Sequence, residues 1–503
     1  ILGRKEGGLK FSMSDNYDLL VVGGGVNGTA IARDAAGRGL KVLLAERDDL
    51  ASGTSQASSK LIHGGLRYLE HLEFRLVKES LKERELLLKS APHIIRPLDF
   101  VLPWIATRRS GFKVRMGLFL YDYLAGKSSL AKSHQINLRR TNWGRGLKHH
   151  YRLGFTYSDC WVDDARFVVS MAMDAAQHGA TILTRTEIGS MHPDGKGWNV
   201  ELRSGGSSRT VSAGLVINVT GVRADQFARE VAGIEKTPDM RLVKGSHIVV
   251  PRLHAGDHAL ILQNHDDRVV FILPFERHFS LIGTTDTPID DPDREHVVDE
   301  DEIDYLLSAV APYVKQVPGP DDVVWSFAGT RPLKKGSNGA ASTASRDYSL
   351  DLSKRGDASM LTVIGGKVTT ARKLAETVLD RVSGLLLAMQ PAWTANATLP
   401  GGDIEDIEGF HAALQKDYPD MQAAFLQGMA DRHGSHCRDI LGNSSTEVEL
   451  GRSFGGGLCE REIDWLREHE WAVTAQDILW RRTKCGLHMS AEQRDEVVAF
   501  LGS

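Results

Sequence analysis

The sequence predicts an α/β protein that begins with a parallel sheet, from three features of its first fifty residues. A short apolar run over 19–22 is typical of a strand buried on both faces. Three glycines spaced as G-x-G-x-x-G follow it directly: Gly23, Gly25 and Gly28. An Ala-rich helix is then predicted over 29–38, and a second apolar run over 41–45 ends at Glu46. This order is that of a Rossmann-like unit that binds a dinucleotide; the alternative is a Gly-rich turn between strand and helix that binds no ligand.

The glycine loop and Glu46 each meet a physical need of such a ligand. One glycine makes the tight turn, one lets the backbone approach a pyrophosphate, and one lets the helix pack closely on the strand. Amide groups at the start of the helix then face the anion. Glu46 lies 18 residues after Gly28, close to the ~20 residues expected for an acid that binds ribose hydroxyls. An acid rather than a base at this position favours FAD or NAD over NADP.

Length and composition indicate the class of protein. A chain of 503 residues is long enough for about three domains. Its 42% hydrophobic and 25% charged residues are ordinary for a globular chain, and a formal charge of −4 gives no reason to expect a nucleic-acid partner. The four cysteines show no C-x-x-C spacing, so we expect neither a disulfide framework nor an iron–sulfur or zinc site, and a reducing, cytosol-facing location is favoured.

Two further expectations concern membranes and the start of the chain. No run approaches ~18 consecutive apolar residues, so no transmembrane helix is predicted. Residues 1–12 contain charges and no long apolar core, so they do not resemble a secretory signal. We expect them to be an expression or upstream remnant that precedes Met13.

A segment rich in Ser and Gly follows the predicted second strand. Over 51–69 small residues and hydroxyls are dense, and a glycine pair precedes Arg67 and Tyr68. Such a loop can pass close under a flat ligand, with hydroxyls and backbone amides as donors; the alternative is a plain Ser-rich connector. The residues predicted to contact the cofactor here are Thr54, Ser55, Ser58, Ser59, Lys60, Leu61, His63, Gly64 and Gly65.

Two later strands are predicted to return beside the glycine loop. The run 215–219 ends at Thr220 and Gly221, which we predict to be neighbours of the cofactor. A last strand over 358–364 is followed by paired glycines and a helix, so that a second helix N-terminus is directed at the cofactor. The residues predicted to contact it there are Gly365, Gly366, Lys367, Val368 and Thr369.

The middle and the end of the chain have different patterns. Over 241–350 short apolar runs alternate with turn residues, which predicts an antiparallel sheet inserted into the nucleotide fold as a substrate-binding domain. The segment 391–400 is typical of a linker. Residues 401–503 are predicted to be mostly helical, with their tryptophans in a core.

Several motifs, in order, resemble those of the FAD-dependent glycerol-3-phosphate dehydrogenases of the aerobic, quinone-linked type. Besides the opening glycine loop, seven further stretches match in the same order. They are 54–70 (Thr-Ser-x-x-Ser-Ser-Lys-Leu-Ile-His-Gly-Gly-Leu-Arg-Tyr-Leu-Glu), 157–166, 244–247, 282–286, 329–333, 365–370 and 477–484. The resemblance extends from about residue 17 to the end of the chain.

The resemblance implies a fold with three parts. The first is an FAD-binding, Rossmann-like domain of the glutathione-reductase type, formed by 13–90, 150–235 and 345–390. The second is an inserted antiparallel-sheet domain that binds substrate and caps the site, formed by 91–149 and 236–344. The third is a C-terminal helical domain over 391–503.

The resemblance also implies a reaction and its partners. FAD-dependent oxidation of sn-glycerol 3-phosphate to dihydroxyacetone phosphate would pass electrons to a membrane quinone. The enzyme would be a homodimer in the cytoplasm, bound peripherally to the inner face of the cell membrane. The chemistry requires cations for a phosphate and a base for the hydroxyl proton, and the family places Arg67, His247, Arg331 and Lys367 around the substrate.

Each of these four residues has a predicted role. Arg331 and Arg67 would clamp the polar groups of the substrate, and Lys367 would stabilise the phosphate or the charge of the reduced flavin. His247 is the candidate general base, because its reference pKa near ~6.5 suits proton removal at neutral pH. The alternatives are a satisfied strand histidine for His247 and a structural ion pair for Arg331. Tyr68 and Thr285 are weaker candidates for neighbouring contacts.

The segment 106–152 is strongly basic and contains an apolar stretch, 116–124. Its basic residues, against the single acid Asp122, are Arg108, Arg109, Lys113, Arg115, Lys127, Lys132, Arg139, Arg140, Arg145, Lys148 and Arg152. An anionic membrane surface attracts such a stretch by ~1 kcal/mol per nearby Lys or Arg. The alternative for 116–124 is a cap-domain helix packed on the core.

Three other functions stay open. A glycerol-3-phosphate oxidase of the same fold would return electrons to oxygen, and acceptor preference would distinguish it. An amino-acid oxidase of the same fold would also use an arginine clamp, so substrate screening is the test. A non-catalytic, flavin-bound scaffold at a membrane would have no need for Arg67, His247, Arg331 and Lys367 together.

Overall fold

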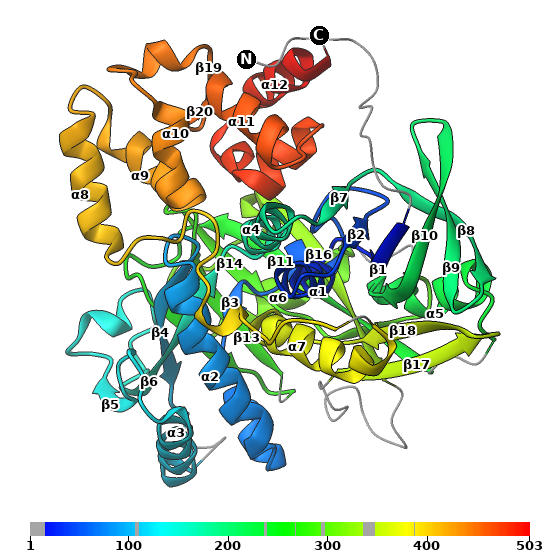
Figure 1. The fold of residues 1–503 in the computed structure, drawn as a ribbon. Coiled ribbons are helices and arrows are strands. Elements are labelled where there is room, and N and C mark those ends of the chain that lie inside the picture. Colours follow the sequence, from blue (N-terminus) through cyan, green and yellow to red (C-terminus); the bar gives the residue numbers. More distant parts are fainter. Residues whose placement is uncertain are drawn as a thin grey trace.

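The computed structural model describes residues 16–105, 110–235, 239–266, 268–292, 297–334, 348–386 and 388–502. The expected remnant 1–12 and the basic residues Arg108 and Arg109 lie outside the described residues. Two large sheets lie side by side in the molecule, and the C-terminal helices, orange to red in Figure 1, cover one side of them.

The first sheet carries the predicted dinucleotide fold. Its strands are β1 (Asn16–Val22), β2 (Val42–Ala45), β7 (Thr181–Leu183), β8 (Glu187–Asp194), β9 (Gly197–Ser204), β10 (Ser207–Asn218), β17 (Ser349–Arg355) and β18 (Ala358–Ile364). The central order is β17-β18-β10-β1-β2-β7, and β18, β10, β1, β2 and β7 run parallel. The carboxyl ends of β1, β10 and β18 therefore meet at one edge of the sheet, as the sequence predicts.

Three helices cover one face of this sheet. α1 (Val26–Gly37) packs between α4 (Asp164–Gln177) and α7 (Ala371–Val382) (Figure 1). The alanines of α1 allow this close packing, and they share a core with the apolar side chains of β1 and β2 that point to the same face. The other face of the sheet buries a second core, which includes Trp198 of β9.

The second sheet is mixed and mainly antiparallel. Its strands are β3 (Leu61–Ile62), β4 (Ile95–Pro103), β5 (His134–Asn137), β6 (Leu153–Val162), β11 (Met240–Pro251), β12 (Ala259–Gln263), β13 (Val269–Phe275), β14 (Phe279–Gly283), β15 (Thr287–Ile289) and β16 (Trp325–Lys334). β11 pairs with β14, β15 and β16, and helix α6 (Glu300–Val310) packs against this region. The inserted antiparallel sheet is thus confirmed. β3 and β6 belong to it although both fall in segments predicted for the first domain.

Two helices lie at the outer end of the second sheet. α2 (Phe74–Ser90) buries Arg84, which pairs with Asp159 of β6, and Glu83, which pairs with Arg372 of α7. α3 (Gly111–Ala125) packs on α2 with Leu118 and Tyr121 buried. In no described helix does an apolar stretch reach the length needed to cross a membrane.

The C-terminal domain is helical, as predicted. Its helices are α8 (Ile407–Asp417), α9 (Ala423–His433), α10 (Cys437–Leu441), α11 (Glu460–His469) and α12 (Ala491–Gly502), with a small hairpin of β19 (Ser453–Gly455) and β20 (Leu458–Cys459). Trp465 and Trp480 pack against its cores, and Trp471 packs against the core of the first sheet. The short helical segment α5 (Ala224–Gln226) follows β10.

Candidate active site

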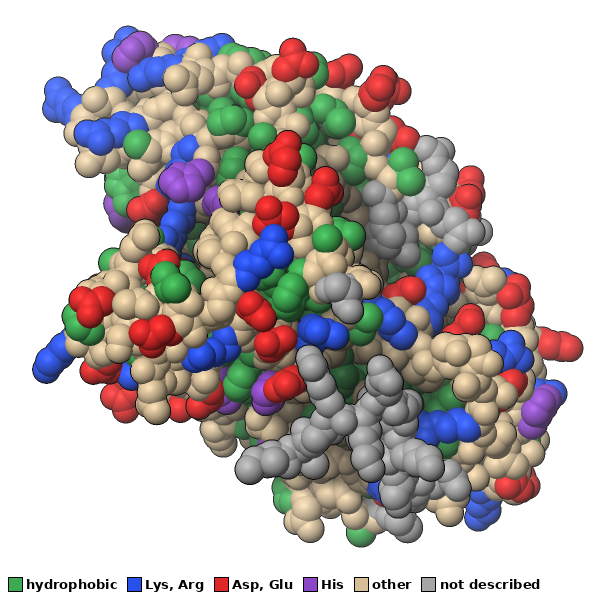
Figure 2. Space-filling view, turned by 90° about the horizontal axis from the view of Figure 1, so that it is seen from above, with side chains coloured by type: hydrophobic (Ala, Val, Ile, Leu, Met, Phe, Trp, Pro, Cys, Tyr) green, Lys and Arg blue, Asp and Glu red, His purple; other side chains and the backbone are tan. Residues whose placement is uncertain are grey.

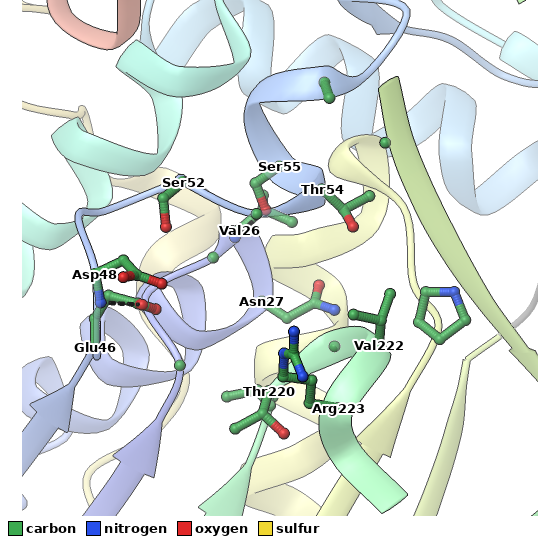
Figure 3. A pocket seen from close by; sticks show the side chains of 18 of the residues that line it. Val26, Asn27, Glu46, Asp48, Ser52, Thr54, Ser55, Thr220, Val222 and Arg223 are labelled. Atoms are coloured by element: carbon green, nitrogen blue, oxygen red, sulfur yellow. Dashed lines mark hydrogen bonds between the residues drawn. The ribbon is translucent and has the colours of Figure 1, made fainter. Parts of the chain in front are cut away.

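A cavity of about 920 Å³ extends from the carboxyl edge of the first sheet to the second sheet. This volume is near the upper end of the range for small-molecule and cofactor sites, as a long ligand requires. One end, here the Glu46 end, is lined by Glu46, Asp48 and Arg185; the other, the His247 end, is lined by His247 and Arg331. Figure 3 shows Glu46 and Asp48 at one side of the cavity, with Asn27 and Thr54 farther along it.

The glycine loop after β1 leaves no room for side chains. A Cβ on Gly23 would lie 2.6 Å from the carbonyl oxygen of Val219, and the φ angle of Gly23 is +116°. A Cβ on Gly25 would lie 2.9 Å from Ser55 Oγ. A Cβ on Gly28 would lie 1.9 Å from the carbonyl oxygen of Gly23. Gly23 and Gly25 line the cavity, whereas Gly28 lies outside the lining and lets α1 pack on β1.

The first turn of α1 is presented to the cavity. Gly25 precedes the helix without a capping side chain, and Ser55 Oγ accepts a hydrogen bond from the amide of Val26 at 2.9 Å. Asn27 donates from Nδ2 to the carbonyl of Gly365 at 2.9 Å. Its buried Oδ1 has no hydrogen-bond partner among the described residues. Val26 and Asn27 line the cavity, so the positive end of the helix dipole is available to an anion there.

Glu46 is held rigidly at the end of β2. Its Oε2 accepts from the amide of Gly24 at 2.6 Å and its Oε1 accepts from the amide of Asp48 at 2.8 Å. Burial raises the pKa of Glu46, and the two amide donors act in the opposite direction. Each carboxylate oxygen keeps a second lone pair for a hydroxyl donor, so the residue fits the predicted binding of ribose hydroxyls.

The Ser-rich segment passes between the two sheets. Thr54 Oγ1 donates to the carbonyl of Thr330 at 2.7 Å, which joins the segment to β16. Asp164 Oδ2 accepts from the amide and Oγ of Ser58, at 3.1 and 2.7 Å. Lys60 Nζ lies 2.7 Å from Asp164 Oδ1, and Lys60 is 1% exposed and outside the lining. It neutralises a buried carboxylate behind the cavity.

The end of this segment approaches α2 and α3. The amide of Gly64 donates to Tyr121 Oη at 2.8 Å, and a Cβ on Gly64 would lie 2.5 Å from Leu81 Cδ2. Gly65 has a φ angle of +77° and begins the turn that follows. Tyr68 lines the cavity, with Lys367 Nζ 3.9 Å from its ring centroid, whereas Arg67 lies outside the lining. The assignment of Arg67 to the substrate stays a prediction.

His247 lies on β11, between β14 and β16. Its Nε2 is 2.9 Å from Ser59 Oγ, and its ring stacks on Phe327 with centroids 5.0 Å apart. Gly283 lies opposite on β14, where a Cβ would come within 2.0 Å of His247 Cδ2. Burial, with the charges of Lys60 and Arg331, lowers the pKa of His247 to about 3. The imidazole is therefore neutral at pH 7, but it is a weaker base than its reference pKa suggests.

Arg331 lies on β16, opposite Val243 of β11. Its Nη2 lies 3.3 Å from the carbonyl oxygen of Thr285 and 3.3 Å from Asp286 Oδ1. Its side chain is 28% exposed and lines the cavity. Arg331 thus has both features considered from the sequence, an ion pair and a position in the site.

The structure brings most of the predicted site residues to one cavity. Those in the lining are Gly23, Gly25, Glu46, Thr54, Ser55, Ser58, Ser59, Leu61, His63, Thr220, Gly221, His247, Arg331, Gly365, Gly366, Lys367, Val368 and Thr369. Those outside it are Gly28, Lys60, Gly64, Gly65 and Arg67. In the described part of the chain, no cluster of three or more His, Cys, Asp or Glu could hold a metal ion.

The sequence did not identify several lining residues. Asn27, within the glycine fingerprint, and Arg185, after β7, were not singled out. Thr474, Gln476, Asp477 and Arg481 come from the C-terminal domain, which was assigned no site. Asp477 and Arg481 lie in the motif 477–484, but the motif did not indicate that they line the cavity.

Comparison with known proteins identifies the family. The family model described as "FAD dependent oxidoreductase" matches residues 18–372. A second family model, described as "C-terminal domain of alpha-glycerophosphate oxidase", matches residues 392–501. The chain is 47% identical to D-erythritol 1-phosphate dehydrogenase of Brucella abortus (strain 2308), covering 97% of this chain and 98% of that protein. It is 44% identical to aerobic glycerol-3-phosphate dehydrogenase of Escherichia coli (strain K12), covering 97% of each.

A solved structure agrees with both the fold and the cofactor. Glycerol-3-phosphate dehydrogenase from Bacillus halodurans, complexed with FAD, superposes with a TM-score of 0.73 at 25% identity, over 97% of this chain and 94% of that one. The glycine loop, the fixed Glu46 carboxylate and the long cavity fit FAD. FAD is therefore the cofactor. The chain belongs to the FAD dependent oxidoreductases and, within them, to the family of the FAD-dependent glycerol-3-phosphate dehydrogenases.

Proposed function

We propose that the enzyme oxidises sn-glycerol 3-phosphate to dihydroxyacetone phosphate at the His247 end of the cavity. The observation that carries this proposal is the distribution of charge along the lining. Among the described lining residues, the carboxylates are Glu46, Asp48, Asp49, Glu187, Glu230 and Asp477, in segments that lie around the Glu46 end. The lining at the His247 end carries Arg331 and Lys367 instead. Arg47, Arg185, Arg223 and Arg481 also line the cavity, but only at the His247 end do cations lie in the lining without carboxylates, so a phosphate dianion is favoured there.

The residues of the His247 end have complementary roles in this reaction. Arg331 and Lys367 bind the phosphate, and the contact of Arg331 with Asp286 and the carbonyl of Thr285 fixes its guanidinium. FAD, when bound, would supply the acceptor for the hydride of the alcohol carbon. His247 accepts the hydroxyl proton, with its ring oriented by Ser59 and Phe327. The negative phosphate nearby raises the pKa of His247 and makes it a stronger base when substrate is bound.

A second candidate substrate is D-erythritol 1-phosphate. The 47% identical relative carries that name, and its identity exceeds that of the E. coli relative. Both substrates are polyol monophosphates, so Arg331, Lys367 and His247 would serve either one. The longer polyol adds one carbon and one hydroxyl that must find room and a hydrogen-bond partner in the cavity.

The test is flavin reduction in the holoenzyme without oxygen. Each polyol phosphate is mixed anaerobically with the enzyme, and bleaching of the oxidised flavin band is followed over a range of concentrations. Faster reduction by sn-glycerol 3-phosphate at equal concentration supports the proposal. Faster reduction by D-erythritol 1-phosphate makes that compound the substrate. If neither compound bleaches the flavin, the enzyme does not oxidise these polyol phosphates, and amino acids are the next substrates to test.

We further propose that the electrons leave to a membrane quinone and that α3 contacts the lipid surface. Phe112, Met116, Phe119 and Tyr123 are spaced by four, three and four residues, so they form one stripe along α3. They are 72%, 45%, 63% and 74% exposed. Leu72, which follows the short helical turn 66–71 that contacts α3, is 72% exposed. A stripe of this kind is typical of a helix that lies in a membrane interface.

The charges around the stripe support an anionic surface as the partner. Lys113 and Arg115 are exposed on α3 beside it, and each adds ~1 kcal/mol of attraction near such a surface. By contrast, Figure 2 shows acidic, basic and apolar side chains interspersed over the face that carries the C-terminal domain. The predicted homodimer and the location at the inner face of the cell membrane stay predictions.

The opposite face of α3 is joined to the cavity. Tyr121 is 1% exposed, donates to Asp159 at 2.8 Å, and accepts from the amide of Gly64 at 2.8 Å. Gly64 follows His63, which lines the His247 end. This connection supports a short path from the reduced cofactor to an acceptor in the membrane. Reoxidation of the substrate-reduced enzyme by a soluble quinone analogue, faster than by oxygen, is expected; faster reoxidation by oxygen would identify an oxidase.

A further inference from the structure

The C-terminal domain supplies part of the cavity wall at the Glu46 end. Thr474, Gln476, Asp477 and Arg481 line this end together with Asp48, Asp49 and Arg185 of the first domain. They belong to a turn and to the π-helical segment Asp477–Arg482 that follows it. These residues lie far along the chain from Glu46, so their position depends on how the C-terminal domain docks.

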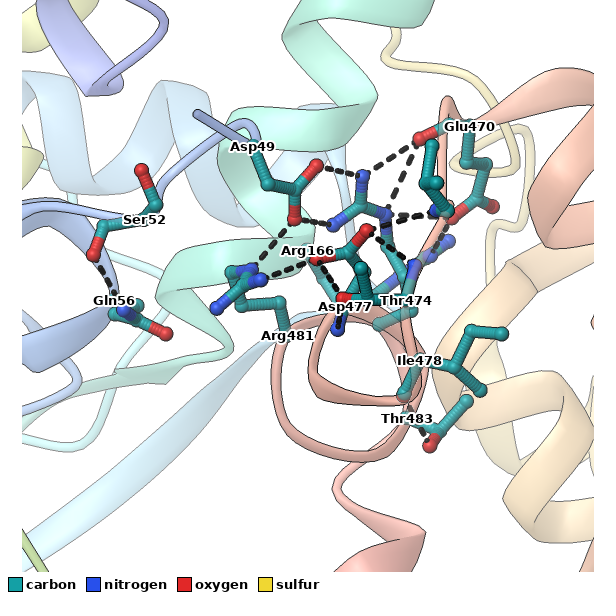
Figure 4. A network of polar contacts seen from close by, with 12 residues as sticks. Asp49, Ser52, Gln56, Arg166, Glu470, Thr474, Asp477, Ile478, Arg481 and Thr483 are labelled. Carbon is teal, nitrogen blue, oxygen red and sulfur yellow. Dashed lines mark hydrogen bonds and ion pairs between the residues drawn. The ribbon is translucent and has the colours of Figure 1, made fainter. Parts of the chain in front are cut away.

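The C-terminal domain docks through ion pairs with Asp49, in the segment that follows Glu46, and with Arg185, which follows β7. Arg482 binds Asp49 through two nitrogens, at 2.7 and 2.8 Å, and Arg481 Nε lies 2.5 Å from Asp49 Oδ2. Arg185 Nη2 lies 2.8 and 2.7 Å from the two oxygens of Asp477. Figure 4 shows Arg481 directed at both Asp49 and Asp477 where the two domains meet.

Further contacts extend this interface along α4. Arg166 of α4 pairs with Glu470, and Lys484 Nζ lies 2.6 Å from each oxygen of Asp163. Asp49, Glu470, Arg482 and Lys484 are each no more than 1% exposed. Removing one partner from such pairs leaves an uncompensated buried charge, so the segment after Glu46 depends on the C-terminal domain for its partners.

Gln476 is the residue of this wall best suited to contact a ligand directly. It lines the cavity, its side chain is exposed, and no hydrogen bond from its amide to another described residue is present. A Gln amide offers two donors and an acceptor, which suit the polar edge of an adenine or a ribose hydroxyl. Asp477 beside it remains ionised, because amides of Thr474 and Val473 and the charge of Arg481 outweigh burial and lower the pKa of Asp477 to about 2.

We infer that the C-terminal domain closes the adenosine end of the FAD site and slows release of the cofactor, with Gln476 as a direct contact. The fixed carboxylate of Glu46 lies three residues before Asp49, so docking of the domain also holds the ribose-binding segment in place. Binding of FAD and docking of the C-terminal domain therefore stabilise each other. The inference concerns cofactor retention and does not depend on which polyol phosphate is oxidised.

The first experiment measures FAD release from the full-length holoenzyme after dilution, by the rise in flavin fluorescence. Gln476→Ala removes one hydrogen-bonding group without leaving a buried charge, and should release FAD about 5- to 10-fold faster. Asp477→Asn should release FAD faster still, because it weakens docking. The matched control is Arg452→Gln, which breaks an exposed pair with Glu496 elsewhere in the same domain and should leave release unchanged. An unchanged release rate in Gln476→Ala would contradict the direct contact.

A second measurement does not depend on any variant. Hydrogen exchange is followed in the FAD-stripped, full-length protein alone, with ADP, and with FMN. ADP should slow exchange over 474–484, because it occupies the adenosine end, and should leave α8 of the same domain unaffected. FMN should not protect 474–484. Absence of protection by ADP, or equal protection by FMN, would overturn the inference.

Discussion

The two ends of the FAD cavity differ in how their charged side chains are used. At the Glu46 end, carboxylates and guanidinium groups from two domains pair with each other, as in Asp49 with Arg482 and Asp477 with Arg185. At the His247 end, Lys367 and Arg331, which also pairs with Asp286 outside the lining, face the cavity, and the lining carboxylates belong to the other end. Paired charges fix structure, whereas an excess of cations attracts an anion. The comparison assigns cofactor retention to the first end and substrate chemistry to the second.

The largest expected effect is at His247. Replacing it in His247→Asn should lower kcat about 100- to 10,000-fold with a small change in KM, because removal of a general base affects the transition state more than binding. Steady-state kinetics with sn-glycerol 3-phosphate and a soluble acceptor measure this. The matched variant Ser59→Ala, which only loses the contact with Nε2, should cost about 10-fold at most. A near-normal kcat in His247→Asn would make it a structural strand residue.

Arg331 tests the assignment of charge directly. Arg331→Ala should lower kcat/KM about 100-fold or more, because a phosphate loses a charge-assisted partner. FAD content should stay close to that of the unaltered enzyme, since Arg331 lies away from the Glu46 end. Flavin absorbance per protein and steady-state kinetics measure the two effects on one sample. Loss of FAD with a normal KM would contradict the assignment of substrate binding to the His247 end and of cofactor retention to the Glu46 end.

The apolar stripe of α3 should affect membrane binding and leave the cavity intact. Phe112→Ser combined with Phe119→Ser should lower partition onto anionic phospholipid vesicles about 10-fold or more, because it removes two exposed aromatic side chains. Co-sedimentation measures the bound fraction, and activity with a soluble acceptor should be unchanged. Val448→Ser, at an 85% exposed position of the C-terminal domain, is the control. Equal loss in both proteins would show that the stripe has no special role.

The smallest expected effect is on stability in acid. His93 is buried near Arg166 and His433, behind the docking interface, and neither ring nitrogen has a hydrogen-bond partner among the described residues. Burial, with the nearby charge of Arg166, lowers the pKa of His93 from 6.5 to about 3. Between these pH values the unfolded chain binds a proton that the folded chain does not, so stability falls as the pH is lowered.

The substitution His93→Phe removes the imidazole that binds this proton in the unfolded chain. As the pH is lowered from 6.5, the free energy of unfolding of this variant should fall less steeply than that of the unaltered enzyme, by up to ~1.4 kcal/mol per pH unit. Urea unfolding of the holoenzyme at pH 7.0, 6.0 and 5.0 measures the slope. The same slope in both proteins would mean that His93 is already protonated when folded.

The parts predicted from sequence are those set by short stretches of chain. The first strand, the glycine loop, the helix and Glu46 follow each other within about thirty residues, and local periodicity and glycine spacing are sufficient to identify them. The strands 215–219 and 358–364 were also predicted, because an apolar run followed by glycines indicates a buried strand that ends in a turn, wherever it lies in the chain. The resemblance to a known family then supplied His247, Arg331 and Lys367.

The parts not predicted depend on contacts between distant segments. Asp49 and Arg481 are separated by 432 residues, and no local pattern links them. Lys60 and Ser59 are adjacent, yet Ser59 faces the cavity while Lys60 faces Asp164 behind it. The pKa of His247 is lowered by burial between β14 and β16. The reference pKa of histidine applies to an imidazole in water and does not include this effect.

The most direct measurement compares sn-glycerol 3-phosphate with glycerol as reductants of the enzyme-bound flavin. Both carry the secondary alcohol, and only the first carries the phosphate that the cations of the His247 end would bind. Under anaerobic conditions and at equal concentration, the account predicts rapid bleaching with sn-glycerol 3-phosphate and at least ~100-fold slower bleaching with glycerol. Equal rates with the two compounds would contradict a phosphate-binding role for Arg331 and Lys367.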